Sequence, residues 1–588
     1  MADLIKSPSR DKKSLRDGVE HDGPAETGDM ELLATLGYKQ ELRRHYSTIQ
    51  IFAVAFSIMG LLPSIASTLS FSMPAGPVGM VWGWLVASFF IFIVSLAMAD
   101  MASAMPTAGG LYFWTHYYAA EKWKNPLSFL VGYSNTIGLI GGICSIDCTS
   151  KVDLIQASTI PIIQPHFLPH LRRTYRTIKA QHRRANTIFL FPLDGFANML
   201  LSMISITRDG SWSATRPIIY GTYAATVFSH GFIAIFFGRI MPKIQSACIF
   251  LNVALVVATV IALPIGKSEN APPINSGSYV FGQVENLTTW PTGWAFIMAW
   301  LSPIWTIGAF DSCVHMSEEA THAARAVPLG IISSAGLCGV LGWLSLAVIA
   351  ACMSTDIEGI LNSKFGQPMA QIYFDALGKK GALGFMAVNA IVQYFMGLSI
   401  VLAASRQSWA FARDGALPLS TYFRKVSQHR LMRYQPVRMV CGVVTAAAII
   451  GLLSLIDSAA ANALFSLAVA GNDLAWLTPI LARLIWGQDR FVPGEFYTGK
   501  YLSKPIAWVA VVYMAFAIVL CMIPTEGPNP SAEIMNYTVV INGALWIGAI
   551  LYYALHARKT FKGPQTTVAP EDEGKRIEEE GDSEPKTL

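Results

Sequence analysis

Residues 52–68 have the sequence FAVAFSIMGLLPSIAST, an apolar run that Gly60 and Pro63 interrupt near its centre. With its apolar flanks, the run reaches the roughly 20 residues that a helix needs to cross the hydrocarbon core of a bilayer. Glycine and proline both weaken a helix, the proline because it lacks an N–H group. The stretch therefore predicts a membrane-spanning helix that is broken at mid-depth.

Comparable apolar stretches recur along the rest of the chain. Only 14% of the 588 residues are charged, against roughly 25% in soluble proteins, and no stretch resembles a soluble domain. We predict an all-α polytopic membrane protein with about twelve spans of roughly 20 residues each. The predicted spans are 49–70, 77–99, 126–147, 217–237, 244–265, 293–314, 328–353, 382–404, 437–456, 460–482, 505–524 and 536–556.

The charged residues gather outside these spans. We predict a disordered tail at 1–48, a membrane domain at 49–560 and a disordered, acidic tail at 561–588. Lys and Arg concentrate in the connections on one side, most densely in 405–436, which predicts that both tails are cytoplasmic. The sequon Asn286-Leu-Thr288 then lies outside, where glycosylation is possible.

Residues 148–194 depart from this pattern. They are basic, rich in histidine and free of glycine, and they separate the apolar stretch ending at Asp147 from a shorter one at 195–206. A basic loop at this point would also lie outside, against the positive-inside bias. We interpret the segment as a translated intron or another gene-model error that splits the third span. The alternative is a genuine but atypical loop.

The sixth span contains a second interruption. Its sequence, WLSPIWTIGAFDSCVHMSEEATHAARAVP (300–328), places Pro303 and Gly308 before Asp311. A carboxylate at membrane depth costs about 2.5–3.5 kcal/mol on insertion scales, so such a group is usually functional. We expect Asp311, or a carbonyl beside it, to meet a substrate ammonium group or a proton. The alternative is an Asp that caps the second half-helix.

Two broken helices suggest how a solute is held. Backbone amides left free at Met59, Gly60 and Leu61 would suit a carboxylate, and a simple kink is the alternative. In transporters built from inverted repeats, the solute binds at mid-membrane between such helices. Because the first and sixth spans are five helices apart, we predict a five-plus-five inverted repeat with two accessory helices.

Charged residues beyond the sixth break are candidates for an inner gate. Glu318 and Glu319 follow the break, and the connection after the eighth span carries Arg406, Arg413 and Asp414. Ion pairs among these groups would lock the inward-closed state. The alternatives are a solvated helix end for the glutamates and ordinary positive-inside topology for the arginines.

Two further ionisable residues are candidates for ion coupling. Asp473 in the tenth span can carry a proton, and Lys243 at the start of the fifth span can stand in for a sodium ion or simply snorkel to the interface. The eight cysteines form no CxxC pair, and no metal-ligand cluster, nucleophile elbow or phosphate loop occurs at a membrane edge. We therefore expect no metal, cofactor, nucleic-acid partner or enzymatic activity.

Five segments carry a resemblance to a known family. They are FSIMGLLPSIAST (56–68), GPVGMVWGW (76–84), PTAGGLYFW (106–114), GAFDSCVHMSEEA (308–320) and SRQSWAFARDGALP (405–418). With these segments the chain resembles the amino acid–polyamine–organocation permeases, and in particular their fungal amino acid/choline/4-aminobutyrate branch. The resemblance covers about 45–560, and only 148–194 departs from it.

The resemblance implies a leucine-transporter-type fold and proton-coupled uptake of a small amino-containing solute. Within the branch, the segments are most similar to 4-aminobutyrate permeases; choline, thiamine and polyamine carriers share much of the pattern. A non-transporting nutrient sensor is the alternative of another class. The membrane is expected to be the plasma membrane, with the vacuolar membrane as the alternative. The implied substrate residues are Ile58, Met59, Gly60, Leu61, Ala309, Phe310 and Asp311.

Overall fold

The computed structural model describes residues 24–147 and 195–567, apart from 213, 271–272, 431, 433, 456–457, 525–526 and 531–534. Regular structure in the described part is helical, and an isolated β-bridge joins Tyr46 to Ala320. The all-α prediction is therefore confirmed. The helices are α1 (Pro24–Thr35), α2 (Thr48–Met59), α3 (Leu61–Ser72), α4 (Gly76–Ala104), α5 (Gly110–Tyr118), α6 (Lys124–Asp147), α8 (Phe196–Thr207), α9 (Arg216–Phe236), α10 (Met241–Asn270), α11 (Gly277–Gly282), α12 (Thr292–Met298), α13 (Leu301–Thr306), α14 (Ser312–His315), α15 (Ala323–Cys352), α16 (Ile357–Leu361), α17 (Pro368–Arg413), α18 (Ser420–Phe423), α19 (Val437–Gly451), α20 (Ser458–Ala482), α21 (Ser503–Met522) and α22 (Thr538–Leu555).

The predicted spans coincide with helices. Nine described helical stretches are long and apolar enough to cross a membrane. One of them, Thr48–Ala104, contains the first two predicted spans, because α2, α3 and α4 follow one another closely. The predicted sixth and tenth spans fall on the broken series α12–α14 and on α20. This arrangement is that of a polytopic membrane protein.

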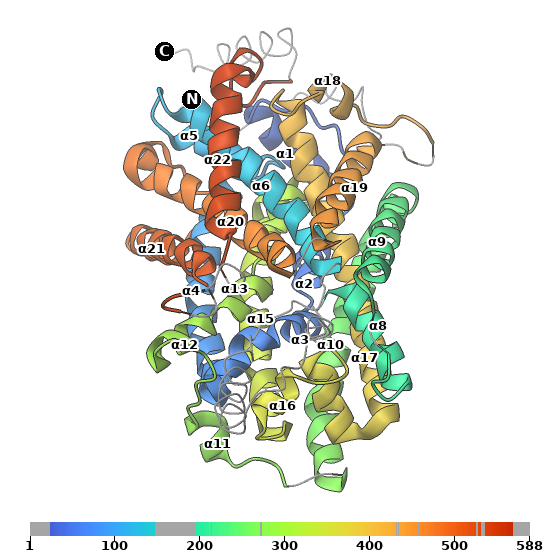
Figure 1. Cartoon of the computed structure of the whole chain (residues 1–588). Helices are drawn as coiled ribbons and strands as arrows, with labels where there is room; N and C mark the ends of the chain where they lie inside the picture. Colours follow the sequence, from blue (N-terminus) through green and yellow to red (C-terminus); the bar gives the residue numbers. More distant parts are fainter. Residues whose placement is uncertain are drawn as a thin grey trace, which may run out of the picture.

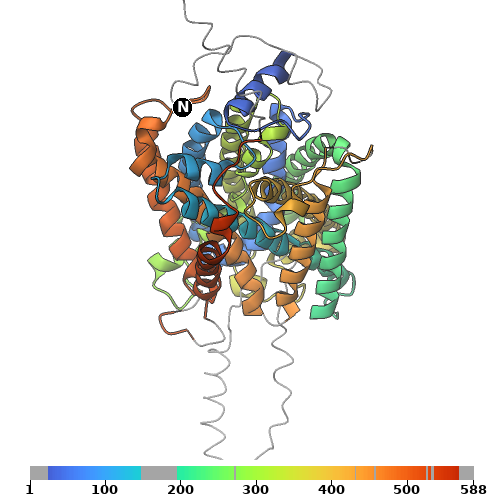
Figure 2. The ribbon, with the colours of Figure 1, turned by 90° about the horizontal axis from the view of Figure 1, so that it is seen from above.

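The helices form a bundle with two distinct ends (Figure 1). α1, α5 and α18 lie at one end, and α11 and α16 lie at the other. We call the first end the terminal face (residues 24–46, 105–123, 316–322, 406–430, 434–436 and 557–567), because the described start and end of the chain meet there. The Lys39 N–H donates to Thr567 Oγ1 at 2.7 Å. Seen from above, the orange and red C-terminal helices lie on one side of the bundle and the green α9 on the other (Figure 2).

Part of each predicted disordered tail is folded onto this face, so the predicted boundaries at 48 and 561 are wrong. Residues 24–47 include α1, and Leu33, Tyr38 and Leu42 of this segment are buried. Phe561 is also fully buried. These apolar side chains lie among many charged residues, and the overall charge of the tails concealed their contribution to the core.

The third predicted span, 126–147, falls on α6, and the shorter apolar stretch at 195–206 forms α8. α6 ends at Asp147 and α8 begins at Phe196, while 148–194 lies outside the described residues. Both helices pack against α17. α6 begins beside the terminal face, and α8 ends toward the other end, where Ser205 Oγ donates to the Lys364 carbonyl at 3.4 Å. α6 and α8 thus contact the same neighbouring helix, α17, as two parts of one helix would.

Deleting 148–194 is expected to increase the amount of folded protein in the membrane severalfold. Joined directly, α6 and α8 would satisfy each other's terminal N–H and C=O groups, which otherwise cost free energy in a bilayer. Membrane abundance of the two forms, measured by size-exclusion of a fluorescent fusion, tests this. Deletion of 568–588 is the control. A shortened form that is less abundant than the full chain would show that the segment is a genuine loop.

Candidate functional site

A cavity of about 40 Å³ lies between the two broken helices and three long neighbours. The broken helices contribute Ile58 of α2 and the connection from α13 to α14. The neighbours are α6, α17 and α20. The lining residues are Ile58, Leu139, Gly142, Ile146, Ile304, Trp305, Thr306, Gly308, Ala309, Asp311, Ser312, Met396, Ile400, Ala468, Val469, Asn472, Asp473 and Trp476.

Asp311 is the first of two carboxylates in this cavity, and it is fully buried. It occupies the N-cap position of α14, yet its side chain makes no capping hydrogen bond. Instead, Asn135 Nδ2 of α6 donates to Asp311 Oδ2 at 3.2 Å. The carboxylate therefore faces the cavity and a neighbouring helix, which contradicts the alternative that it serves as a helix cap.

His315 lies one turn beyond Asp311 and extends the polar contacts toward the terminal face. Its Nε2 is 3.3 Å from Asp311 Oδ2, and its Nδ1 is 3.2 Å from the Ala108 carbonyl oxygen. A carbonyl only accepts, so Nδ1 carries a hydrogen. The backbone N–H of Ala108 donates to Glu318 Oε1 at 3.2 Å. A continuous series of polar contacts thus joins the cavity to Glu318.

Asp473 of α20 is the second cavity carboxylate and is 4% exposed. Its Oδ2 receives no hydrogen bond from any described residue. The preceding residue, Asn472, accepts from Asn135 Nδ2 at 3.2 Å and also lines the cavity. The lining thus contains two carboxyl groups and, among its described residues, neither Arg nor Lys. When ionised, a carboxylate in such a site needs a cationic partner, which suits a solute with an ammonium group.

The break in the first span is set by Gly60. Its φ of 42° and ψ of 66° place it in the left-handed region, where it ends α2 and precedes α3. Its N–H donates to the Phe56 carbonyl at 3.1 Å, so the predicted free amide at Gly60 is wrong. The positions without an intrahelical acceptor are the first ones of α3, Leu61 and Leu62, before Pro63, which has no N–H.

Replacing Gly60 by Ala is expected to destabilise the protein by about 1–2 kcal/mol, because an L side chain is strained in the left-handed region. The new Cβ would also lie 2.8 Å from Sδ of Met396, a residue that lines the cavity. Thermal unfolding of purified protein measures the change. Gly543→Ala is the control, since nothing lies within 4 Å of a Cβ there. Equal midpoints for both variants would contradict the assignment.

The predicted substrate residues fall into two groups. Ile58, Ala309 and Asp311 line the cavity. Met59 and Leu61 are buried beside the break, and Phe310 is fully buried with its ring centroid 4.6 Å from that of the cavity residue Trp476. Phe310 thus supports the wall rather than forming it.

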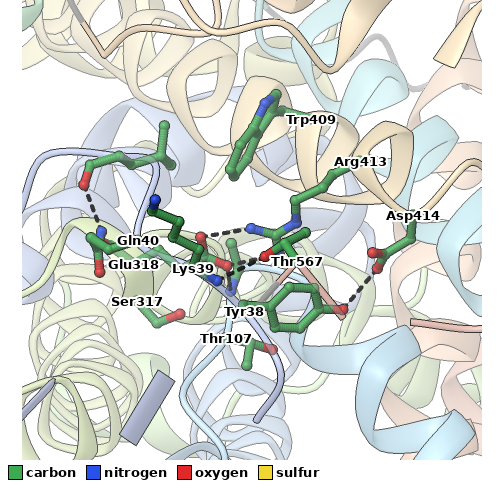
Figure 3. A network of polar contacts seen from close by, with 12 residues as sticks. Tyr38, Lys39, Gln40, Thr107, Ser317, Glu318, Trp409, Arg413, Asp414 and Thr567 are labelled. Atoms are coloured by element: carbon green, nitrogen blue, oxygen red, sulfur yellow. Dashed lines mark hydrogen bonds and ion pairs between the residues drawn. The ribbon is translucent and has the colours of Figure 1, made fainter. Parts of the chain in front are cut away.

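On the terminal face, Glu318 and Arg413 form a bidentate ion pair (Figure 3). Arg413 Nη1 and Nη2 donate to the two carboxylate oxygens at 2.9 and 3.0 Å. Both side chains are at most 4% exposed. The guanidinium carbon is also 4.0 Å from the ring centroid of Tyr38 and 4.7 Å from that of Trp409. The pair joins the segment after the sixth break to the end of α17.

A second ion pair reinforces this closure. Arg406 Nε donates to Glu319 Oε1 at 2.7 Å, and both side chains are buried. Arg44 donates to the carbonyl of Ser317 at 3.1 Å, which attaches the segment before α2 to the same connection. The groups predicted for an inner gate are therefore brought together, and each glutamate pairs with an arginine of α17.

Asp414 gathers three segments of the terminal face around one buried carboxylate. Tyr38 and Tyr112 donate their hydroxyls to Oδ2 at 2.9 and 2.7 Å, and the Gln565 N–H donates to Oδ1 at 3.2 Å. Burial raises the pKa of Asp414 to about 6, although Arg413 and these hydrogen bonds oppose the shift. Burial likewise raises the pKa of the Tyr38 hydroxyl.

The stability of the protein is expected to fall as pH rises from 5 to 7, with Asp414 contributing about 1 kcal/mol. Its folded pKa of about 6 exceeds the ordinary value, so the folded state binds a proton that the unfolded state has already lost. Ionisation then leaves the charge buried. Thermal midpoints at the two pH values test this. In Asp414→Asn the midpoint should fall less between pH 5 and pH 7 than in the wild type. In the control Asp489→Asn, which changes an exposed carboxylate, it should fall as much as in the wild type. The same change in midpoint in both variants would contradict the interpretation.

One predicted coupling residue lies away from the site. Lys243 is exposed at the start of α10 and does not line the cavity. The prediction placed it at the start of the fifth span, with snorkelling as the alternative to ion coupling, and Lys243 does lie in the first turn of α10, after the short 3-10 helix Gly238–Ile240. A lysine at such an end reaches polar surroundings with its long side chain.

The sequence interpretation missed the uncharged polar partners of the cavity. Asn135, Asn472 and His315 were not singled out, although polar groups inside apolar spans were a usable signal. Tyr38 and Tyr112 were missed for another reason: their role depends on segments that meet only in the folded chain. No local pattern identifies a hydroxyl as a partner for a carboxylate several helices away.

Comparison with known proteins shows the family to which the chain belongs. The profile of the amino acid permease family matches residues 46–545. A GABA-specific permease from Saccharomyces cerevisiae is 42% identical, covering 94% of this chain and 88% of its own length. An uncharacterized amino-acid permease from Schizosaccharomyces pombe is 32% identical, covering 97% of this chain and 95% of its own length. A putative polyamine transporter from Candida albicans is 27% identical, covering 95% of this chain and 93% of its own length. The chain, an integral membrane protein, therefore belongs to the amino acid permease family.

Proposed function

We propose that this permease is a proton-coupled uptake system for 4-aminobutyrate or a closely related amino acid. The observation that carries the proposal is the pair of buried carboxylates, Asp311 and Asp473, in one cavity beside a broken helix. The relative from Saccharomyces cerevisiae, named a GABA-specific permease, supports the choice of solute.

Both ends of a zwitterionic solute have partners near the break. Its ammonium group would meet Asp311 and Asp473, which attract a cation in a low-dielectric site. Its carboxylate would approach the first amides of α3 at Leu61 and Leu62, where the helix dipole favours an anion. A four-carbon amino acid carries both of these charged groups on one flexible chain.

Transport in this proposal proceeds by alternating access. The terminal face is cytoplasmic, and the pairs Glu318–Arg413 and Glu319–Arg406 close it while the solute enters from the other side. Opening of the face requires these pairs to separate. Solute bound in the cavity would promote this by displacing Asp311, whose polar contacts continue through His315 and Ala108 to Glu318. The plasma membrane is the proposed location.

A polyamine or choline carrier is the second candidate function. Two cavity carboxylates without a compensating described cation suit a solute with more than one ammonium group, and a putative polyamine transporter is among the relatives. The first amides of α3 distinguish the candidates, because a polyamine has no carboxylate to place there.

Uptake of labelled 4-aminobutyrate by permease-deficient cells that express the chain tests the proposal. Choline, thiamine and putrescine are added as competitors in separate assays. The proposal predicts uptake that excess unlabelled 4-aminobutyrate suppresses and putrescine does not. Uptake of putrescine in place of 4-aminobutyrate would favour the second candidate, and no uptake of either by protein at the cell surface would favour a sensor.

A further inference from the structure

A second carboxylate–imidazole pair is buried behind the cavity wall. Asp147, the last residue of α6, lies with its Oδ2 3.3 Å from Nδ1 of His230 in α9, and both side chains are 0% exposed. α17 closes over the pair at Gly397. A Cβ at that position would lie 2.5 Å from Asp147 Oδ1 and 2.5 Å from His230 Cε1, so only glycine fits.

The two groups have few other polar partners. Neither Asp147 oxygen and neither ring nitrogen of His230 forms a hydrogen bond with a described residue, so the 3.3 Å contact between Nδ1 and Oδ2 is the polar contact that joins the two side chains. The Tyr394 ring packs against the imidazole at a centroid distance of 4.4 Å, but its hydroxyl pairs with Ser229 Oγ at 2.7 Å. Gln393 donates to the Ile146 carbonyl at 2.9 Å instead of to Asp147. The carboxylate and the imidazole therefore balance each other's charge.

Among the described residues, no other charged side chain forms an ion pair with Asp147 or His230. Of the charged residues of α17, Lys379 pairs with Asp209, Arg406 with Glu319 and Arg413 with Glu318. α8 has no ionisable side chain. The Tyr223 hydroxyl of α9 donates to the Ala447 carbonyl, Arg438 of α19 donates to the Tyr422 carbonyl, and Asp473 of α20 faces the cavity. A net charge in such surroundings costs several kcal/mol. The pair is therefore stable when neutral, which requires one proton more than a carboxylate beside a neutral imidazole.

The position of the pair connects it to the cavity. Ile146 and Met396, which precede Asp147 and Gly397 in the sequence, both line the cavity. Gly397 also lies midway along α17 between the kink at Gly378 and the end at Arg413. Movement of α17 that opens the cavity wall would therefore withdraw the Gly397 backbone from the pair.

We propose that Asp147 and His230 together bind the transported proton, at a site separate from the solute cavity. The proton is held between the carboxylate and the imidazole while α17 covers them. It leaves to water when α17 moves away, and a carboxylate beside a neutral imidazole remains. The pair takes up another proton from water once it is again accessible from the side on which the solute enters. This inference rests on the proposed proton-coupled uptake.

Vesicles containing the purified full chain test the inference by two transport assays. One assay measures accumulation of labelled 4-aminobutyrate driven by an imposed pH gradient, and the other measures counterflow at equal pH, which needs no net proton movement. In Asp147→Asn and His230→Gln we expect accumulation to fall about tenfold or more, with counterflow changed less than about twofold. Asp209→Asn, an exposed carboxylate beside Lys379, should leave both unchanged.

Unchanged accumulation in either variant would overturn the inference, as would equal loss of both assays, which indicates only a structural role. Infrared titration of the purified chain is independent of transport. A carboxyl or imidazole signal should titrate in the wild type, disappear in Asp147→Asn and shift in His230→Gln; its absence from the wild type would also overturn the inference. If the wild type shows no counterflow of 4-aminobutyrate, the proposed solute fails, and the infrared result still decides the proton site.

Discussion

Glu318→Gln is expected to open the terminal face and to reduce uptake by about tenfold or more. The substitution leaves Arg413 buried without its bidentate partner, and breaking a buried ion pair in this way costs about 3–5 kcal/mol. This free-energy cost destabilises only the closed state, because the pair is already separated when the face is open. Arg413→Gln should have an effect of similar size.

Labelling of an engineered thiol measures the opening directly. Thr107 is fully buried beside Glu318, so Thr107→Cys in a Cys441→Ser background should resist a polar thiol reagent until the pair is broken. The double variant Glu318→Gln/Arg413→Gln removes both charges and should be less impaired than either single variant. Protected thiols and normal uptake in the single variants would show that the pair is not a gate.

Asp311→Asn is expected to lower uptake by at least about 30-fold, or to shift its pH dependence to more alkaline values, without changing surface abundance. Asn keeps the size of the side chain and can still contact Asn135, but it has no charge for an ammonium group or a proton. Loss of one partner from a buried, hydrogen-bonded charge pair costs about 2–5 kcal/mol, and each 1.4 kcal/mol is a tenfold change.

Two measurements separate this effect from misfolding. Surface biotinylation reports abundance, and thermal unfolding of the purified variant reports stability. Asp209→Asn is the matched control, because that carboxylate is exposed and pairs with Lys379 outside the cavity. An Asp311→Asn variant that takes up solute with normal proton coupling would remove Asp311 from the mechanism.

Much of the fold was predictable because a bilayer restricts the chain so strongly. Apolar runs of helix length located the spans, and the rarity of charge within them singled out Asp311 and Asp473, which both line the cavity. The five-plus-five inverted repeat stays a prediction. The same logic located the glutamates and arginines of the terminal face, because charges at span ends are expected to meet at the interface.

What could not be predicted depends on local geometry and on distant contacts. Free amides were predicted at Met59, Gly60 and Leu61, but the left-handed conformation of Gly60 ends α2 there and begins α3 at Leu61, so the positions without an intrahelical acceptor are Leu61 and Leu62. The amino-acid sequence alone does not predict which backbone amides at the break lack an acceptor. The Asp147–His230 pair was likewise hidden, since its two residues come from different helices and meet only under Gly397.

The most direct test of the account is concentrative uptake of labelled 4-aminobutyrate in permease-deficient cells, with and without a protonophore. The full chain and a form lacking 148–194 are expressed side by side. The account predicts accumulation above the external concentration that the protonophore abolishes, at least in the shortened form. Accumulation that persists with the protonophore, or no uptake by either form at the cell surface, would contradict proton-coupled transport of this solute.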